Sequence, residues 1–346
     1  MKIALDVLGG DFAPMANIEG AITYLTEYGN TASDLILVGD EKVINSKLET
    51  LSFNSSKISI EHTTELVEMH EKPARIFKEK PNSSLVKSIQ LVKERKVDAA
   101  VSSGNTGALL ATSLFLIGKI PGIIRPAFAP FIPTNKGGFI LCDAGANANS
   151  KPQHLLQFAL MAEAYIEHLE KKINPRIGLL NIGVEKNKGN ELSQSTYPLL
   201  EKHIDNFIGN IESRYLFEGK VDVVICDGFT GNIVLKLIEG IISHLFEWIE
   251  NLYTTHENGT NLSSEFLSIL KEIQNNLDHE EYGATPLLGI NGVIMKSHGA
   301  SSSRGIHNSL IATQKSIEEN LTNDIAKRLT IQADIIDSKQ NETNPV

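Results

Sequence analysis

Cysteine is scarce in this chain of 346 residues, which contains only Cys142 and Cys226. Each of the two ends an apolar, strand-like run, a position that favours buried thiols in a reducing compartment over a disulfide framework. The two cysteines lie far apart and have no neighbouring histidine, so the sequence also lacks the ligand spacing of a zinc site.

An excess of positive charge is missing as well. The chain has 32 Lys and Arg against 42 Asp and Glu, a net charge of −10. This balance argues against a general affinity for nucleic acid, which needs a basic footprint, although a local basic pocket remains compatible with it. The hydrophobic share of 41% and the charged share of 21% are those of an ordinary globular protein.

Long apolar runs are also absent. The longest, residues 108–117, stops at Gly118-Lys119 and is too short to cross a bilayer. Asp6 interrupts the apolar N-terminus, so no signal peptide is predicted. We therefore expect a cytoplasmic protein whose contact with a membrane, where it has any, is peripheral.

Three common catalytic signatures do not occur. The sequence has no Gly-x-x-x-x-Gly-Lys-Ser/Thr loop, no Gly-x-Gly-x-x-Gly turn and no Gly-x-Ser-x-Gly elbow. These absences leave a P-loop, a dinucleotide fingerprint and an activated serine nucleophile without support.

Two stretches with the same pattern stand out among what is present. Residues 102–107 (SSGNTG) and 227–232 (DGFTGN) each follow an apolar strand-like run, contain Gly-x-Thr-Gly and lead into an apolar helix. Glycine permits a sharp turn and a close approach to a ligand, and the free N–H groups of a helix start favour anions. One such turn often serves geometry alone, but two with the same lettering indicate a shared phosphate-sized site.

Strand-like and helix-like segments alternate along the chain. Strands are predicted at 2–6, 34–38, 59–61, 98–101, 138–142, 176–181 and 221–226, with helices between them. This alternation predicts an α/β fold with a mainly parallel sheet and helices on both faces, where ligands bind beyond the carboxyl ends of the strands. Residues 1–335 are expected to form one catalytic unit, either a single body or two lobes around a cleft. Residues 336–346 lack apolar content and are expected to be a disordered tail.

For several residues near these strand ends, the sequence allows more than one role. Lys188, between a strand end and a helix, either faces solvent or serves catalysis and phosphate pairing. His298, in Ser-His-Gly, is either a general acid/base or a turn residue. Asp143, Asp227 and Glu191 could together hold a divalent ion, but capping of helices is the more common use of such residues, and no metal site is predicted.

A long amphipathic helix is predicted over residues 233–253. Its apolar stripe contains Leu235, Ile238, Ile242, Leu245, Ile249 and Leu252, while Lys236, Glu239, Ser243, Glu247 and Glu250 face away. Core or dimer packing is the expected use of the stripe, because anionic lipid would repel the glutamates of the polar face.

Eight stretches from the N-terminal strand to about Leu310 carry a resemblance to a known family: LDVLGGDFAP, VSSGNTGALLA, RPAFAPFIPT, DAGANANSKPQHLLQFA, RIGLLNIGVEKNKGNEL, FIGNIESRYLF, VVICDGFTGNIVLKLIEG and KSHGASSSRGIHNSL. They resemble the bacterial phosphate acyltransferases of phospholipid synthesis, the acyl-carrier-protein:phosphate transacylases. The resemblance implies that inorganic phosphate attacks the thioester of a long-chain acyl–acyl carrier protein, giving acyl phosphate and free carrier protein.

The resemblance also implies a setting for this reaction. It implies an isocitrate-dehydrogenase-like and phosphate-acetyltransferase-like fold, a homodimer and no redox cofactor. Such enzymes are cytoplasmic and loosely membrane-associated, and they hand acyl phosphate to a membrane glycerol-phosphate acyltransferase, which gives residues 233–253 a potential membrane or partner role. Because the carrier is acidic, docking needs a local basic patch, for which Arg75, Lys78 and Lys80 are candidates; their alternative is a solvated loop.

Site roles follow as hypotheses. The catalytic candidates are Lys188, as counter-charge to phosphate, His298, as the proton donor to the leaving thiolate, and Asn232. The substrate-binding candidates are Asn105, Thr106, Gly107, Lys151, Asn190, Asp227, Thr230, Gly231 and Arg304. The chain departs from the family pattern at Gln153, where a glutamate is usual, and at Arg304 and His307, where lysines are usual. The alternatives are a phosphate-linked dehydrogenase of the same broad fold and a non-catalytic protein that binds a phosphoryl ligand.

Overall fold

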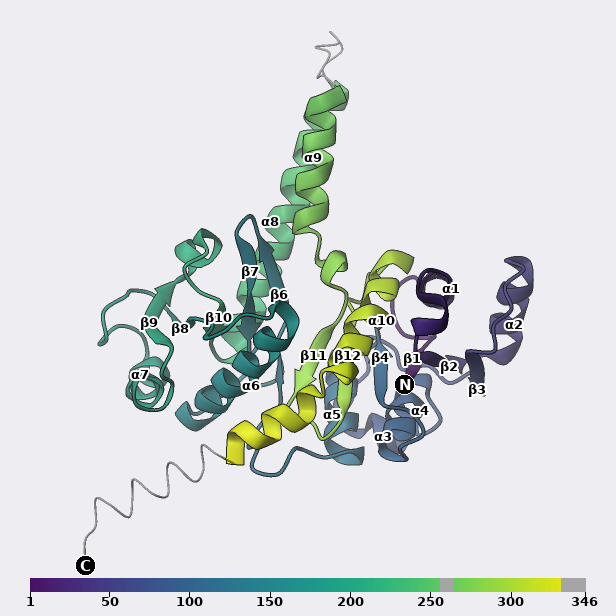
Figure 1. The fold of residues 1–346 in the computed structure, drawn as a ribbon, viewed down its shortest axis with the longest axis horizontal. Helices are drawn as coiled ribbons and strands as arrows, with labels where there is room; N and C mark the ends of the chain where they lie inside the picture. The colour runs from purple at the N-terminus through teal and green to yellow at the C-terminus, as the bar shows by residue number, and fades with distance from the viewer. Residues whose placement is uncertain (256–263, 331–346) are drawn as a thin grey trace, which may run out of the picture.

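The computed structural model describes residues 1–255 and 264–330 and builds them around two β-sheets (Figure 1). The larger sheet has the strand order β3 (Ile58–His62), β2 (Asp34–Gly39), β1 (Lys2–Asp6), β4 (Ala99–Ser102), β12 (Val293–Lys296), β11 (Thr285–Leu288) and β5 (Ala127–Phe128). The smaller sheet has the order β6 (Phe131–Thr134), β7 (Gly137–Cys142), β10 (Val223–Ile225), β8 (Ile177–Asn181) and β9 (Phe207–Glu212). Neighbours pair in parallel except β12–β11, β11–β5 and β6–β7. The predicted mainly parallel α/β fold is confirmed.

Helices cover both faces of the larger sheet, because successive side chains of a strand point to opposite faces. Ile3 and Leu5 of β1 pack with Leu310 of α10 (Ser303–Glu318), in a cluster that also includes α1 (Met15–Tyr28). Ala4 points the other way and packs with Ile89 of α4 (Ser84–Lys93), beside α5 (Thr106–Leu116). The helix α2 (Glu41–Thr50) packs beside β3 at the edge of the sheet.

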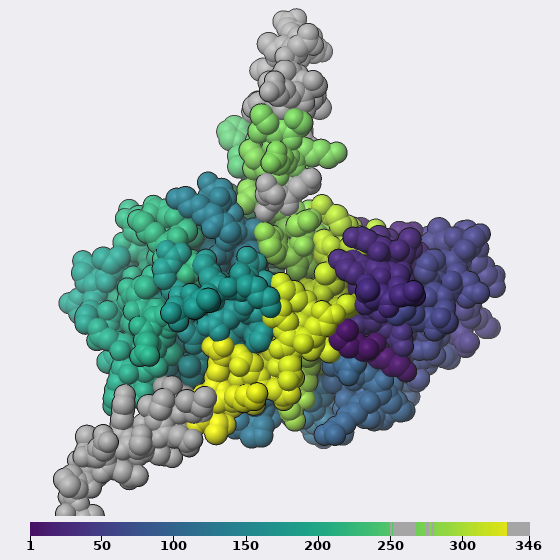
Figure 2. Space-filling model, in the orientation of Figure 1, coloured from purple at the N-terminus to yellow at the C-terminus, as the bar shows by residue number. Residues whose placement is uncertain are grey.

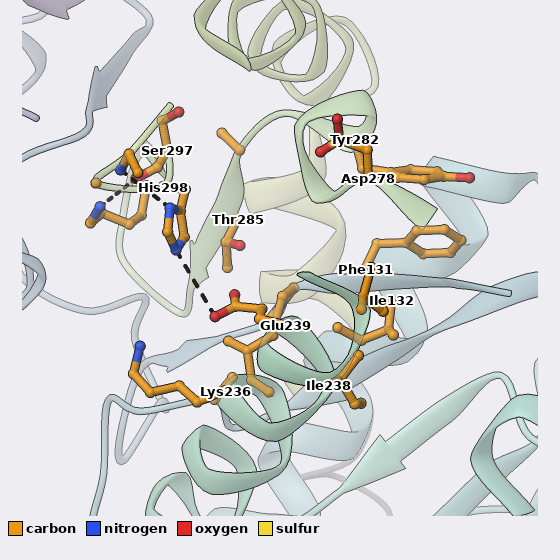
Figure 3. A pocket seen from close by; sticks show the side chains of 18 of the residues that line it. Phe131, Ile132, Lys236, Ile238, Glu239, Asp278, Tyr282, Thr285, Ser297 and His298 are labelled. Carbon is orange, nitrogen blue, oxygen red and sulfur yellow. Dashed lines mark hydrogen bonds and ion pairs between the residues drawn. The ribbon is translucent and has the colours of Figure 1, made fainter. Parts of the chain in front are cut away.

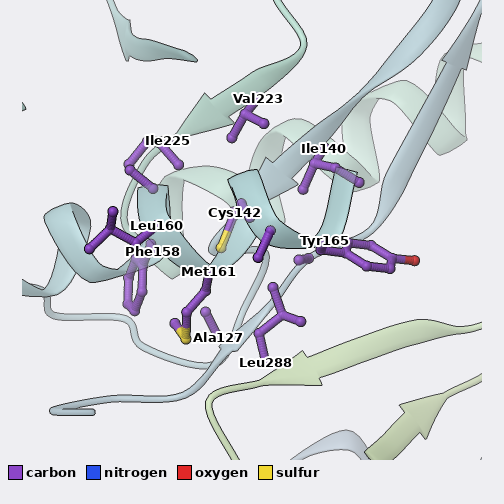
Figure 4. Packing of buried hydrophobic residues seen from close by; sticks show 14 of the residues in the cluster. Ala127, Ile140, Cys142, Phe158, Leu160, Met161, Tyr165, Val223, Ile225 and Leu288 are labelled. Carbon is purple, nitrogen blue, oxygen red and sulfur yellow. The ribbon is translucent and has the colours of Figure 1, made fainter. Parts of the chain in front are cut away.

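The smaller sheet is covered in the same way. Ile140 of β7 packs with Phe158 of α6 (Pro152–Glu170), in a cluster that also holds Cys142 (Figure 4). Leu141 points to the opposite face and packs with Leu216 of the 3₁₀ helix η3 (Ser213–Glu218). The helix α7 (Glu191–His203) connects β8 to β9. Both cysteines are buried and free, as the sequence predicts.

Two helices, α8 (Gly228–Thr255) and α9 (Ser264–Leu277), project from the body of the molecule in the same direction (Figures 1 and 2). The predicted polar-face residues Lys236, Glu239, Ser243 and Glu247 line a cavity against the body; Glu239 is half-buried there, and the other three are exposed. Large apolar side chains are also exposed on α8, at Phe229, Ile233, Leu237, Ile241, Leu245 and Trp248. Of these, Leu245 belongs to the predicted apolar stripe. The segment Gly228–Ile249 is long and apolar enough to cross a membrane by length and composition alone. The side chain of Leu252 lies outside the described part.

Three further segments are compared with what their sequence predicts. Residues 108–117 are apolar all round, which predicts a buried helix, but Phe115 of α5 is 60% exposed and stacks on Phe77 with ring centroids 3.8 Å apart. Prolines 121, 126, 130 and 133 predict an irregular connection, but β5 and β6 lie in it. A polar loop is predicted at residues 256–264; Ser264 is the first residue of α9, and residues 256–263 and the tail at residues 336–346 lie outside the described residues.

Candidate active site

A cavity of about 970 Å³ lies between α8 and the carboxyl ends of strands from both sheets (Figure 3). The larger sheet contributes Asp11 after β1, Thr106 after β4 and His298 after β12, and the smaller sheet contributes Ala144 after β7 and Asn232 after β10. Its volume is typical of small-molecule sites, which span about 300–1,000 Å³. One residue of each predicted stretch, Thr106 and Asn232, therefore lines this cavity, and the binding of phosphate there stays a prediction.

Hydrogen bonds fix the loops of the larger sheet against one another. The buried carboxylate of Asp6 accepts from the Ser102 hydroxyl at 2.6 Å and from the backbone N–H of Gly9 at 3.2 Å. The Asp11 N–H donates to the Gly299 carbonyl at 2.8 Å. Burial raises the pKa of Asp6, and the hydrogen bond from Ser102 opposes that rise. Hydrogen bonds thus join the loops that follow β1, β4 and β12.

In the first stretch, the hydrogen-bonding groups of the Asn105 side chain bind other parts of the protein. Its carbonyl accepts from the Ala108 N–H at 3.0 Å and caps α5, while its amide donates to the carbonyl oxygens of Glu68, Met69 and Glu71 at 3.0 to 3.3 Å. What faces a ligand here is the start of α5, where Thr106 lines the cavity and the first backbone N–H groups lack intrahelical partners.

The second stretch is the start of α8 itself. The Asp227 carboxylate accepts from the Thr230 N–H at 3.0 Å and from the Thr230 hydroxyl at 2.7 Å. A Cβ on Gly231 would lie 1.9 Å from the Asp143 carbonyl oxygen, so this glycine permits close packing of α8 on the loop after β7. Asn232 is the residue of this stretch that lines the cavity.

Lys296, the last residue of β12, lines the cavity with its ammonium held by the protein. Its Nζ donates to the Ser103 carbonyl at 3.2 Å and to the Ser297 carbonyl. Burial lowers the pKa of Lys296 from its ordinary value of 10.5 to about 8, although the carboxylates of Asp6 and Asp11 act in the opposite direction. A poorly hydrated ammonium in a cavity wall is a candidate partner for an anion.

His298 faces α8 across the cavity. Its Nε2 lies 4.0 Å from the Glu239 carboxylate (Figure 3). The Ala300 N–H donates to Nδ1 at 3.2 Å, so a neutral ring carries its proton on Nε2. Lys236, one turn before Glu239 on α8, lines the same end. This end of the cavity therefore holds a proton donor, a carboxylate and two cations.

Nine of the twelve predicted site residues lie outside the lining that the described chain gives this cavity. Five of them belong to the two stretches that contribute Thr106 and Asn232, namely Asn105, Gly107, Asp227, Thr230 and Gly231. The other four lie elsewhere in the chain. Asn190 caps α7, and Lys151 is the exposed residue before α6. Arg304 pairs with Asp278, and Lys188 is exposed in the loop after β8. A contact of these four residues with substrate stays a prediction.

Two of the three acidic residues considered for a divalent ion, Asp143 and Asp227, have other partners. Asp143 accepts from the backbone N–H groups of Phe128 at 3.0 Å and Asn147 at 2.7 Å, and Asp227 caps α8. Burial raises the pKa of Asp143. Within residues 1–255 and 264–330, no group of three or more His, Cys, Asp and Glu residues is arranged to hold a metal ion.

Lys296, Asp11 and Glu239 are cavity residues that the sequence did not single out. A signal existed for Lys296, because it is a charged residue that closes an apolar strand directly before Ser-His-Gly. No comparable signal existed for Glu239, since a helical pattern separates polar from apolar faces without saying which flank meets the body.

Comparison with known proteins decides the family. The family model described as "Fatty acid synthesis protein" matches residues 1–324. A protein named "Phosphate acyltransferase" from Halothermothrix orenii is 43% identical over 93% of this chain and 96% of its own length. This chain belongs to the phosphate acyltransferase family. A relative of the same name from Clostridioides difficile is 40% identical over 99% of this chain and 98% of its own. The protein is thus an acyltransferase that uses phosphate.

Solved structures show the same fold in other acyltransferases. A phosphotransacetylase from Streptococcus pyogenes has a TM-score of 0.61 and 17% identity, over 92% of this chain and 94% of that chain. The EutD phosphotransacetylase from Staphylococcus aureus has a TM-score of 0.58 and 16% identity, over 91% and 94%. At this level of identity, the likeness establishes the fold alone.

Proposed function

We propose that this acyltransferase moves a long-chain acyl group from the thioester of acyl carrier protein to inorganic phosphate. A phosphate oxygen bonds to the carbonyl carbon and the carbon–sulfur bond breaks, so the products are acyl phosphate and the free carrier thiol. The observation that carries this proposal is one cavity lined by Thr106 and Asn232, at the starts of two helices, together with Lys296 and His298. Helix starts and cations favour an oxyanion.

Phosphate is strongly hydrated, so the site has to desolvate and align it. The backbone N–H groups at Thr106 and Gly107 and the side chain of Asn232 hold its oxygens, and Lys296 and Lys236 balance its charge. Positioning of this kind can supply up to about 7–11 kcal/mol of the barrier reduction. The same backbone N–H groups suit the oxyanion that develops on the thioester carbonyl.

His298 donates the proton that the leaving thiolate takes up. The donor is Nε2, the ring nitrogen that faces Glu239 across the cavity at 4.0 Å. No covalent enzyme intermediate is needed. Burial raises the pKa of Cys142 and of Cys226 well above the ordinary value, so neither thiol suits the role of acyl acceptor.

Lys188 and Lys151 are the remaining proposed counter-charges. A Lys188→Ala protein is expected to lose phosphate-dependent turnover by at least about tenfold, since one charge-assisted hydrogen bond is worth about 1.5–3 kcal/mol. Full turnover in that variant, with normal folding, would remove Lys188 from the site and leave Lys296 as the main cation.

The carrier protein docks beside the cavity mouth. Met69 lines the cavity, and the exposed cations Arg75 and Lys78 follow it in the chain. Lys78 lies 5.6 Å from the ring centre of Phe77, which stacks on Phe115, so charge and apolar surface are presented together. An acidic carrier fits such a patch. Lys80, the third candidate, is paired with Glu71 and has less to offer a partner.

The exposed apolar face of α8 accommodates a second copy of this chain. A contiguous apolar face of this kind marks an interaction surface, which supports the proposed homodimer. The enzyme is proposed to be cytoplasmic, to contact the membrane peripherally and to pass acyl phosphate to a membrane glycerol-phosphate acyltransferase in phospholipid synthesis. No redox cofactor is proposed.

The decisive experiment mixes the purified full chain, palmitoyl carrier protein and inorganic phosphate, and measures thiol release as phosphate increases. Saturable, phosphate-dependent release with formation of acyl phosphate is the expected result. Release that ignores phosphate would indicate a thioesterase, and saturation by ligand without release would indicate a binding protein. A cofactor-dependent change in absorbance would indicate a dehydrogenase. Each of these outcomes would overturn the proposal.

A further inference from the structure

The cavity is polar on one side and apolar on the other. Figure 3 shows Lys236, Ser297 and His298 grouped on one side, with Phe131 and Tyr282 on the opposite side. The rings of Phe131 and Tyr282 pack with centroids 4.5 Å apart. This division suits a ligand with a polar reacting head and a long apolar tail.

The length of the cavity can be measured along the helix α8. Asn232, Gly240 and Phe246 all line it. At about 1.5 Å of rise per residue, Gly240 lies about 12 Å and Phe246 about 21 Å along the helix from Asn232. One acyl chain spans half of the bilayer hydrocarbon core, about 15 Å. The wall that α8 provides is therefore long enough for a long acyl chain.

Gly240 leaves open space in the middle of this wall. Glycine inside a helix is destabilising relative to alanine. A Cβ built on Gly240 meets no atom within 4 Å, so packing of the folded chain does not require glycine there. The position lies one turn after Lys236, on the cavity side of α8. The missing side chain thus widens the cavity at a point that a ligand has to pass.

Charges near the apolar side are paired within the protein or exposed to solvent. Asp278, which lines the cavity, pairs with Arg304. Glu247, also in the lining, has 66% of its side chain exposed, so its charge stays in contact with water. Burial raises the pKa of Tyr165, so this cavity residue is neutral near physiological pH. A hydrocarbon tail placed here would not leave an isolated charge without water.

We propose that the acyl chain of the substrate lies along α8, from the polar side at Lys296, past Gly240, to the aromatic side at Phe246 and Tyr282. The length of this wall sets the longest linear acyl chain that the enzyme accepts. The inference depends on the acyl transfer proposed above, because the thioester has to lie at the polar side.

The test fills the cavity with a larger side chain at two positions along α8. Gly240→Leu places an apolar side chain about 12 Å from Asn232, and Ser243→Leu places the same side chain about 16 Å away. His244→Leu is the matched control: His244 has 84% of its side chain exposed and is not part of the cavity lining. For each full-length variant, kcat/KM is measured with octanoyl, dodecanoyl and palmitoyl carrier protein, and oligomeric state is measured in parallel.

In Gly240→Leu we expect the ratio of kcat/KM for palmitoyl over octanoyl carrier to fall by on the order of 100-fold. This is the loss for about three to four methylenes displaced from their apolar site, at roughly fourfold for each. Ser243→Leu should shift the cut-off to longer chains than Gly240→Leu does, and His244→Leu should leave the ratio unchanged. An unchanged ratio in both cavity variants, or equal loss of all chain lengths in folded protein, would overturn the inference. A wild-type enzyme that releases no thiol would instead refute the proposed function itself.

Discussion

Replacing Lys296 by methionine should stabilise the fold and remove phosphate-dependent transfer at the same time. Methionine keeps most of the length of the side chain but carries no charge. The lysine ammonium is largely cut off from water and lines the cavity beside His298. A charged side chain that is buried for function should lower the stability of the fold. The expected gain in stability and the expected loss of transfer therefore have the same cause, the removal of this buried charge.

The expected gain in stability can be worked from the structure. The difference between the ordinary pKa of 10.5 and the value of about 8 for Lys296 corresponds to about 3 kcal/mol at neutral pH. Methionine leaves the carbonyl oxygens of Ser103 and Ser297 without this donor, which costs about 1 kcal/mol. The net gain is about 2 kcal/mol, or an increase in Tm of roughly 3 °C for a chain of this length.

The gain should depend on pH with a definite sign. Between pH 8 and 10.5 the unfolded chain binds more protons at Lys296 than the folded chain does, so the stability of the wild-type protein rises with pH through this window. Below pH 8 both states are protonated, and the penalty is present in full. The stability difference between Lys296→Met and wild type should therefore be largest below pH 8 and shrink towards pH 10.5.

The assays are chemical denaturation across pH and thiol release with palmitoyl carrier protein and phosphate. Turnover should fall by about 100-fold or more, the usual cost of losing one group that stabilises developing charge. Lys236→Met is the matched control for stability, because Lys236 is exposed on the same cavity and its removal should not stabilise the fold. A destabilised Lys296→Met protein, or one with normal phosphate dependence, would refute the reasoning.

Three further predictions concern the proton donor, the packing of α8 and the docking patch. His298→Gln should lower kcat with palmitoyl carrier by about 100-fold but affect a thiophenyl thioester much less, because that thiolate leaves without a proton; equal losses would argue against proton donation. Gly231→Ala should destabilise by at least about 2 kcal/mol, since its Cβ would overlap the carbonyl oxygen of residue 143, whereas Gly240→Ala, with open space around its Cβ, should stabilise by up to about 1 kcal/mol; denaturation curves compare the two. Arg75→Glu with Lys78→Glu should raise KM for the carrier-bound substrate by about tenfold at low salt and leave KM for palmitoyl pantetheine unchanged; an equal change for both substrates would rule out carrier docking there.

The sequence predicted the parallel α/β framework because burial on both faces makes such strands nearly continuous apolar runs. Residues 2–6 and 34–38 are examples, and both are confirmed as strands. The strand β12 (Val293–Lys296) was not predicted, because it is four residues long and ends in a lysine. Its place next to β4 follows from a long-range pairing that local patterns do not encode.

The candidate site was predictable in part for a related reason. Ligands bind beyond the carboxyl ends of parallel strands, so polar turns after β4 and β10 were expected to meet at one edge of a single sheet. The two strands belong to different sheets, and Thr106 and Asn232 nevertheless line one cavity. Which side chains of these turns can bind a ligand depends on hydrogen-bond partners that lie far away in the chain. Asn105 is an example, because its amide donates to the carbonyl oxygens of residues 68, 69 and 71. The turn predicts an anion site, but only tertiary contacts decide which of its groups are free.

The kind of cation at this cavity bears on the proposed chemistry. Lysines 236 and 296 line it, and no arginine does among the described residues. An arginine would bind two phosphate oxygens in a fixed fork, whereas a lysine acts as a point charge with rotatable donors. A phosphate that is to attack a thioester needs its charge balanced without having its oxygens tied up. A pKa near 8 for Lys296, lowered by burial and opposed by Asp6 and Asp11, fits that need, because the ammonium is charged at neutral pH and already has acceptors of its own. The cavity is thus better suited to holding phosphate as a nucleophile than to binding it as tightly as possible.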